Sequence, residues 1–184
     1  LNEISLEHNE GYFMHNIQSV RNLMIVENDG IGKNITVQVL DGILCHNGEK
    51  LLQKYTYKNK NKEEFLSDYN NSYKDKKVAR NLIPMTLEAC VVRISDIIGY
   101  IGRDLEDAIE VGKIKRKNIP ENIVNNLGDN NASIVNTLIL DIIDNSYDKN
   151  FIELSDKVYN ALNDLIKFNY KNIYLVANSK DEIE

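Results

Sequence analysis

Three polar side chains recur at every fourth position of the stretch VVRISDIIGYIGRDLEDAI, which covers residues 91–109. They belong to Asp96, Tyr100 and Asp104. Because a helix turns by about 100° per residue, successive members of this set drift by only about 40°, and all three share one helix face. At a rise of about 1.5 Å per residue, Asp104 lies about 12 Å further along the axis than Asp96. Two carboxylates and a phenol spaced in this way could contact a ligand as long as a nucleoside triphosphate.

Asp96 is the unusual member of this set, because its neighbours in the chain are apolar: Val91, Val92, Ile94, Ile97 and Ile98. Moving a carboxylate into such surroundings costs several kcal/mol unless something meets its charge. A metal ion, a basic partner such as Arg93, or a local opening to water would each remove that cost. A functional role and an internal ion pair both remain open at this point.

Two glycines, Gly99 and Gly102, lie inside the same predicted helix. Each costs about 1 kcal/mol of helix stability relative to alanine, and the usual compensation is the close approach of another helix or of a ligand. The charged residues further along, Asp107 and Glu110 in particular, indicate a solvated helix face.

A second group of polar residues lies in GYFMHNIQSVRNLMIVE, residues 11–27. His15 stands at the start of a predicted helix, with Gln18, Ser19 and Asn22 on the same side. A neutral imidazole at a helix start could act as a general acid or base, or hold a phosphate oxygen. A histidine that only caps or packs at the helix entry is the structural alternative.

The elements that must position these residues are helices. Prolines occur only at Pro84 and Pro120, strand-like alternation is scarce, and long apolar periodicities dominate, so we predict an all-α fold. The predicted helices cover residues 1–8, 15–27, 36–46, 61–79, 85–111, 120–127, 131–147 and 153–168. Thr86 is the predicted N-cap of the long helix that carries the polar stripe. The apolar stripe of that helix consists of Ile94, Ile97, Ile98, Ile101, Leu105 and Ile109.

The overall charge excludes some classes of partner. The chain has 22 basic and 28 acidic residues in 184, a net charge of -6, which argues against a surface built for nucleic acid or an anionic membrane. Residues 55–77 are rich in Lys, Asn and Tyr, but acidic residues dilute their charge, so we expect a solvated loop and an exposed helix rather than an RNA-binding patch. Apolar runs are too short to span a bilayer and no signal peptide is evident, so we expect a cytoplasmic protein.

Cys45 and Cys90 lie in apolar helical patterns without a CxxC spacing, which predicts buried, reduced thiols. The chain contains no His-Asp dipeptide and no HExxH, GxxxxGK[ST] or GxSxG motif. These absences argue against a self-contained zinc, P-loop or serine-triad enzyme. The chain begins at Leu1 rather than at a methionine, and we expect it to be a piece of a longer protein.

Three segments, in the same order, resemble the HD-domain deoxynucleoside triphosphate triphosphohydrolases, the dGTPase-like family. FMHNIQSVRNL is similar to that family's F-x-H-N-x-Q-S-x-R stretch, and NITVQVLDGILCHNGE to its L-T-x5-G-I-L-x-H helix. MTLEACVVRISDIIGYIGRDLEDAI is similar to S-L-E-A-Q-V-V-x-x-A-D-x-I-A-Y-x3-D-x-x-D-A. The resemblance covers about residues 1–113, while residues 114–184 match mainly in being helical.

This resemblance implies an incomplete HD-domain-like helical bundle, with residues 1–113 as part of the catalytic core and residues 114–184 as a helical extension packing on it. Asp96 takes the place of the last aspartate of the family's H…HD…D set, which holds a divalent metal ion such as Mg, Mn or Fe. Tyr100 and Asp104 take the places of residues at the sugar and phosphate side of the nucleotide, and His15 that of a histidine facing the triphosphate. The implied reaction is hydrolysis of a deoxynucleoside triphosphate to a deoxynucleoside and inorganic triphosphate, in a homo-oligomer.

The chain departs from the family in one respect. The family's other metal ligands lie upstream of the H-N-x-Q-S segment, and we expect this chain to start too late to contain them. With one of four ligands, these residues alone should not hold the metal tightly or turn over substrate. We therefore expect the middle to C-terminal part of such an enzyme, whose partner is the missing N-terminal part of the same protein. Two alternatives remain: a catalytically inactive HD-derived helical domain that binds nucleotide or mediates oligomer contacts, and a helical scaffold in which Asp96 pairs internally.

Overall fold

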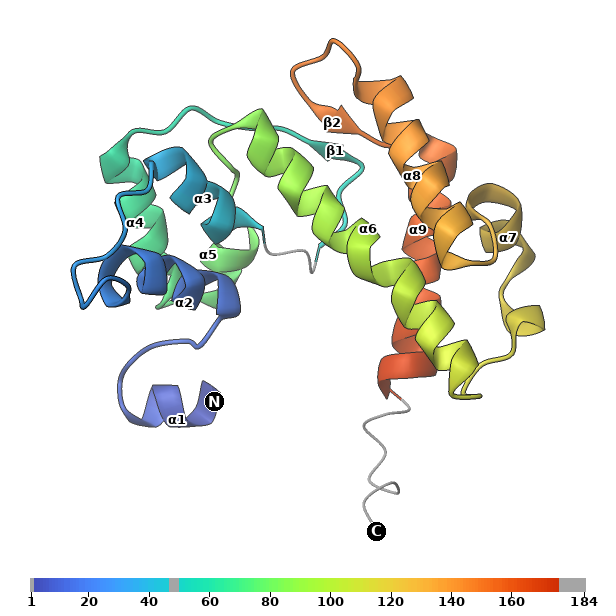
Figure 1. Ribbon diagram of the computed structural model, residues 1–184, viewed down its shortest axis with the longest axis horizontal. Helices are drawn as coiled ribbons and strands as arrows, with labels where there is room; N and C mark the ends of the chain where they lie inside the picture. Colours follow the sequence, from blue (N-terminus) through green and yellow to red (C-terminus); the bar gives the residue numbers. More distant parts are fainter. Residues whose placement is uncertain (1, 47–49, 176–184) are drawn as a thin grey trace. The chain divides into compact units, whose positions relative to one another are not determined.

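The computed structural model describes residues 2–46 and 50–175 (Figure 1). In chain order its helices are α1 (Asn2–Glu7), α2 (His15–Arg21), the π-helical η1 (Asn22–Val26), α3 (Val37–Cys45), α4 (Lys62–Ser72), α5 (Lys76–Arg80), α6 (Leu87–Glu110), the 3₁₀-helical η2 (Arg116–Asn118), α7 (Glu121–Leu127), α8 (Asn131–Ser146), α9 (Asp156–Asn169) and the π-helical η3 (Tyr170–Tyr174). Two strands, β1 (Lys54–Tyr55) and β2 (Ile152–Glu153), pair as a small sheet. The predicted all-α class is confirmed.

The predicted helices are found, with one exception. Residues 61–79 form two helices, since α4 ends at Ser72 and the side chain of Asp75 accepts a hydrogen bond from the Lys77 amide at 2.7 Å. Asp75 is thus the N-cap of a new helix, α5. Its side chain satisfies a backbone amide that would otherwise donate to a carbonyl within a continuous helix. The predicted cap of the long helix is confirmed, because the Ala89 amide donates to Thr86 Oγ1 at 3.2 Å.

The described chain divides into two compact units. The first contains residues 1–50 and 55–94, and the second contains residues 51–54 and 95–184. Helix α6 belongs to both, because its residues up to Ile94 lie in the first unit and those from Ser95 onward lie in the second. The boundary predicted at residue 113 follows the matched motifs and stays a prediction.

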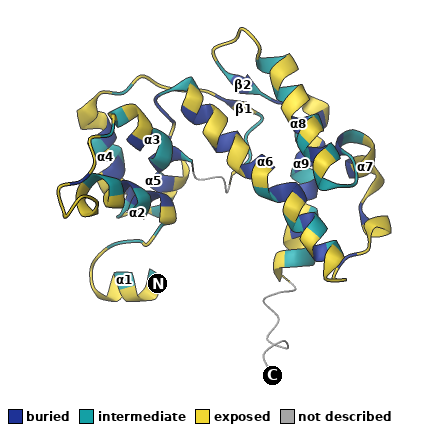
Figure 2. Cartoon of the chain, viewed as in Figure 1, coloured by how far each residue is buried: buried dark blue, intermediate teal, exposed yellow. Residues whose placement is uncertain are grey.

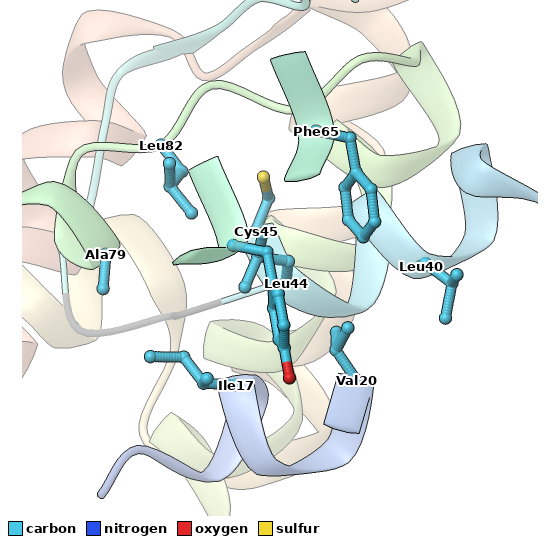
Figure 3. Close-up of a cluster of buried hydrophobic side chains, with 9 residues drawn as sticks. Ile17, Val20, Leu40, Leu44, Cys45, Phe65, Ala79 and Leu82 are labelled. Atoms are coloured by element: carbon cyan, nitrogen blue, oxygen red, sulfur yellow. The ribbon is translucent and has the colours of Figure 1, made fainter. Parts of the chain in front are cut away.

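A hydrophobic core joins α2, α3, α4 and α5 within the first unit (Figure 3). Its members are Ile17, Val20, Leu40, Leu44, Cys45, Phe65, Tyr69, Ala79 and Leu82. The free thiols of Cys45 and Cys90 are both buried, as predicted. The interpretation of residues 55–77 as a solvated loop and exposed helix is wrong in part, because Tyr55, Phe65 and Tyr69 are buried. Lysine and asparagine dominate the composition there, but α4 still presents one aromatic face to this core.

In the second unit, α7 packs against α8 and α9, and α8 contacts β2. The apolar stripe predicted for α6 is confirmed here, because Ile97, Ile98, Ile101 and Leu105 are buried while Asp107 and Glu110 are exposed. Figure 2 shows buried and exposed residues alternating along α6. Asn169 of α9 is fully buried and its amide donates to the Ile101 carbonyl at 3.0 Å. Along residues 2–46 and 50–175, no helix has both the length and the apolar character needed to cross a membrane.

Candidate functional site

The predicted polar stripe lies on α6, within the second unit. Asp96 is exposed, while Tyr100 and Asp104 are partly buried. Asp104 has a partner that the sequence did not indicate, because the Tyr174 hydroxyl of η3 donates to its Oδ2. Burial raises the pKa of Tyr174, and the hydrogen bond to Asp104 raises it further. Tyr174 therefore stays a neutral donor that orients the Asp104 carboxylate.

The surroundings of Asp96 differ from those expected from the sequence. Its side chain is exposed, so water solvates the carboxylate and no large desolvation cost arises. The nearby Val91 and Val92 are themselves 45% and 50% exposed. Among residues 2–46 and 50–175 no ion pair includes Asp96, so these residues do not supply the internal partner that the scaffold alternative requires. Arg93, the suggested partner, is buried and its Nη1 donates to the Leu82 carbonyl at 3.0 Å.

Asp96 by itself does not fit a divalent metal ion. Protein sites for such ions gather at least three side-chain or main-chain ligands at about 2.0–2.6 Å. Within residues 2–46 and 50–175, no group of three or more His, Cys, Asp or Glu side chains could hold a metal. An ion at Asp96 would therefore need ligands that these residues do not offer.

His15 is the first residue of α2, in the first unit, and its side chain is exposed. Its Nε2 lies 3.2 Å from Nε2 of His46, the C-cap residue that follows α3, and the two rings stand at 73° to each other. The next residue, Asn16, is fully buried and its amide donates to the Leu44 carbonyl at 2.6 Å. Asn16 therefore ties the start of α2 to the last turn of α3, which holds the two histidines together.

His46 was not among the predicted site residues. The available signal was the histidine of the second matched segment, NITVQVLDGILCHNGE, where α3 ends. His46 also lines a cavity of about 700 Å³ between α3 and the start of α6. Most of its other walls are apolar, formed by residues such as Val39, Ile43 and Val92. The cavity suits an apolar group better than a triphosphate.

A buried network of charges supports α3 in the first unit, and sequence reasoning missed it. Asp41 is fully buried; its Oδ1 lies 2.8 Å from Lys60 Nζ, and its Oδ2 accepts from the Met85 amide at 2.7 Å. Lys60 Nζ also lies 2.8 Å from Asp68 of α4. Burial would lower the pKa of Lys60, but the hydrogen bonds to Asp41 and Asp68 raise it above its ordinary value. The network joins α3, α4 and the segment that enters α6.

Curated proteins from three bacteria match nearly the whole chain. "Deoxyguanosinetriphosphate triphosphohydrolase-like" proteins of Clostridium perfringens and Caldanaerobacter subterraneus are 33% and 32% identical to it, over 94% and 95% of its residues. One from Desulfatibacillum aliphaticivorans is 30% identical over 88%. The chain belongs to the deoxyguanosinetriphosphate triphosphohydrolase-like family. It spans 44%, 42% and 41% of the lengths of these relatives.

No family model and no solved structure matches this triphosphohydrolase-like chain. An alignment over 94% of 184 residues leaves about 11 residues outside it, so all four predicted site residues lie within the matched region. The same coverage extends the likeness well beyond residue 113. The likeness therefore extends into residues 114–184, which were expected to match mainly in being helical.

Proposed function

We propose that this chain is part of an enzyme that hydrolyses deoxynucleoside triphosphates to a deoxynucleoside and inorganic triphosphate. The observation that carries the proposal is the likeness of nearly the whole chain to deoxyguanosinetriphosphate triphosphohydrolase-like proteins. The polar stripe of Asp96, Tyr100 and Asp104 on one face of α6 supports it. Because the chain spans less than half of these relatives, the active site would include residues beyond the described ones.

Within this proposal, Asp104 binds the sugar rather than the phosphates. An ionised carboxylate only accepts hydrogen bonds, so it matches a sugar hydroxyl and repels a triphosphate. The hydrogen bond from Tyr174 holds the carboxylate in one orientation, which lowers the entropy lost on binding. Tyr100, one turn earlier, lies on the same face of α6 and would lie near the same sugar.

Asp96, at the other end of the stripe, would face the triphosphate. Two negative groups approach each other only where a cation lies between them, and Asp96 would be one ligand of a divalent ion completed by the missing upstream part. When bound, the ion would polarise the phosphate. His15 would exchange a proton with the attacking water or with the 5′ oxygen that leaves the α-phosphorus.

The test measures release of inorganic triphosphate from dGTP and the other deoxynucleoside triphosphates by the protein with its upstream part present. Asp96→Ala should abolish release. Asp107→Ala is the matched control, because Asp107 lies on the same helix, is exposed, and pairs only with exposed Arg103, at 3.9 Å, among the described residues. Full activity of the Asp96 variant would end the proposal.

Tyr174→Phe tests the sugar contact separately. The variant removes one hydroxyl and frees Asp104, so KM for the nucleotide should rise by about 10-fold, the equivalent of one hydrogen bond to a charged group. The triphosphate product should stay the same. An unchanged KM would show that the orientation of Asp104 does not matter for binding.

A second candidate function is a catalytically inactive helical domain that binds nucleotide or mediates contacts in a homo-oligomer. Such a domain would need no metal ion, and in the described part of the chain no group of three or more His, Cys, Asp or Glu side chains could hold one. It predicts that the protein with its upstream part binds a deoxynucleoside triphosphate, seen by calorimetry, but releases no triphosphate from it.

A further inference from the structure

The two histidines of the first unit are linked by a hydrogen bond whose direction can be worked out. His46 Nδ1 lies 2.5 Å from the carbonyl oxygen of Ile43, and His46 Nε2 lies 3.2 Å from His15 Nε2. A carbonyl oxygen only accepts hydrogen bonds, so His46 Nδ1 must carry a proton. In the neutral ring His46 Nε2 then has the lone pair, and it must accept a hydrogen bond from His15.

The consequence falls on His15. Because its Nε2 donates to His46, its proton is on Nε2, and Nδ1 is the unprotonated atom of the neutral ring. Nδ1 can take up a proton without any change in the bond between the rings, since Nε2 donates in both the neutral and the charged ring. His46 thus leaves one atom of His15 free to act as a base.

The surrounding contacts hold this pair in place. Buried Asn16 anchors the start of α2 to Leu44, which lies two residues before His46 in the last turn of α3. Ile43, the acceptor for His46, lies in the last turn of the same helix, so its carbonyl is one that α3 leaves without a helical partner. The chain therefore presents His46 Nε2 toward His15 through main-chain contacts, and no charged group is needed to do so.

We propose that His46 is a positioning residue, which sets His15 in the Nε2–H form and makes Nδ1 the atom that accepts a proton from the attacking water. This inference rests on the proposed function for the role of His15, but the direction of the hydrogen bond does not. When water attacks the α-phosphorus, its oxygen forms the new bond to phosphorus and its proton moves to His15 Nδ1. The bond to the 5′ oxygen breaks, and that oxygen takes up the proton that His15 Nδ1 received, so the neutral ring is restored.

Nuclear magnetic resonance tests the direction of the bond without any assay of activity. The ¹⁵N-labelled 184-residue chain is measured near pH 8, where a free imidazole in water is mostly neutral. His46 should show a protonated Nδ1, which is the minor form of a free histidine, and His15 a protonated Nε2. A scalar coupling between the two Nε2 atoms should appear across the hydrogen bond. A His46 ring protonated on Nε2 would overturn the inference.

Three variants separate positioning from folding. His46→Ala should remove the coupling, while His46→Gln should keep His15 protonated on Nε2, because the glutamine oxygen can accept the same hydrogen bond. His8→Ala is the matched control, since His8 is exposed and is the only other histidine in the chain. Dispersed amide spectra of all three variants would show that they fold. If a variant does not fold, the wild-type spectrum still tests the hydrogen bond.

Kinetics then test the role. In the protein with its upstream part, His46→Ala should lower kcat by about 10-fold to 100-fold with little change in KM, as when a group that orients a functional histidine is removed. His46→Gln should recover most of that loss, and His8→Ala should match the wild type. A kcat unchanged in His46→Ala would overturn the inference. If the wild type releases no triphosphate at all, the proposed function fails while the spectra still decide the hydrogen bond.

Discussion

Gly99 and Gly102 lie three residues apart in α6 and offer a matched pair of substitutions to alanine. At Gly99 a Cβ atom would meet no other atom within 4 Å. At Gly102 it would lie 2.6 Å from Asn131 Oδ1 and 3.2 Å from Asn131 Cα, where α8 begins. Helix propensity therefore acts alone at Gly99, whereas at Gly102 it opposes the packing of α8.

The expected magnitudes follow from these distances. Replacing a helical glycine by alanine stabilises by about 1 kcal/mol, so Gly99→Ala should raise the free energy of unfolding by that amount. At Gly102 rotation of the Asn131 side chain relieves the first contact, but the backbone contact remains. The Asn131 amide also donates to Glu106 Oε1 at 3.1 Å, which holds that backbone in place. Overpacking costs about 1–3 kcal/mol, so the net effect of Gly102→Ala should be a loss of up to about 2 kcal/mol.

Thermal unfolding followed by circular dichroism measures the difference. In a chain of this size 1 kcal/mol shifts Tm by about 2–4 °C, so Gly99→Ala should melt about 2–4 °C above the wild type and Gly102→Ala below it. The double variant should lie between the two single variants. If Gly102→Ala stabilises the chain as much as Gly99→Ala does, then α8 does not approach α6 at this glycine and the reasoning is refuted.

Three further outcomes can be measured on the same chain. Asp41→Asn should lower the free energy of unfolding in urea by about 3 kcal/mol, the lower end for breaking a buried ion pair, because Lys60 keeps Asp68 as a partner. The pKa of Lys60 is higher in the folded chain than the ordinary value of about 10.4. Charged Lys60 therefore stabilises the fold fully below that pH, and this stabilisation is lost as pH rises through the raised pKa. Lys60→Met should remove this loss of stability at alkaline pH. Burial raises the pKa of Cys90 to about 11 and that of Cys45 also well above its ordinary value, so at pH 8 neither thiol should react with a disulfide reagent until urea unfolds the chain. Rapid labelling of the folded chain would contradict the burial of both.

Local patterns explain why much of the fold could be predicted. The helix boundaries, the Thr86 cap and the burial of Ile97 and Ile101 all depend on residues a few positions apart. The split between α4 and α5 was missed because Asp75 competes with helix propensity through a single side-chain hydrogen bond. The strands were missed because two residues are too few to show alternation.

The candidate site also has a part that local sequence predicts and a part that it does not. The spacing of Asp96, Tyr100 and Asp104 placed them on one face of one helix, and the neighbouring motifs carried the family resemblance that the relatives bear out. Their partners came from elsewhere in the chain. Tyr174 lies 70 residues from Asp104, and His46 lies 31 residues from His15. No local pattern links such pairs.

The sequence by itself determined the helical class, the polar stripe of α6 and the family to which the chain belongs. Only the tertiary structure decided that water solvates Asp96, that Tyr174 holds Asp104, that Asp41 and Lys60 form a buried pair, and that His46 faces His15. The physical reason is that the helical period sets the face on which a side chain lies, whereas contacts between distant residues decide what covers that face.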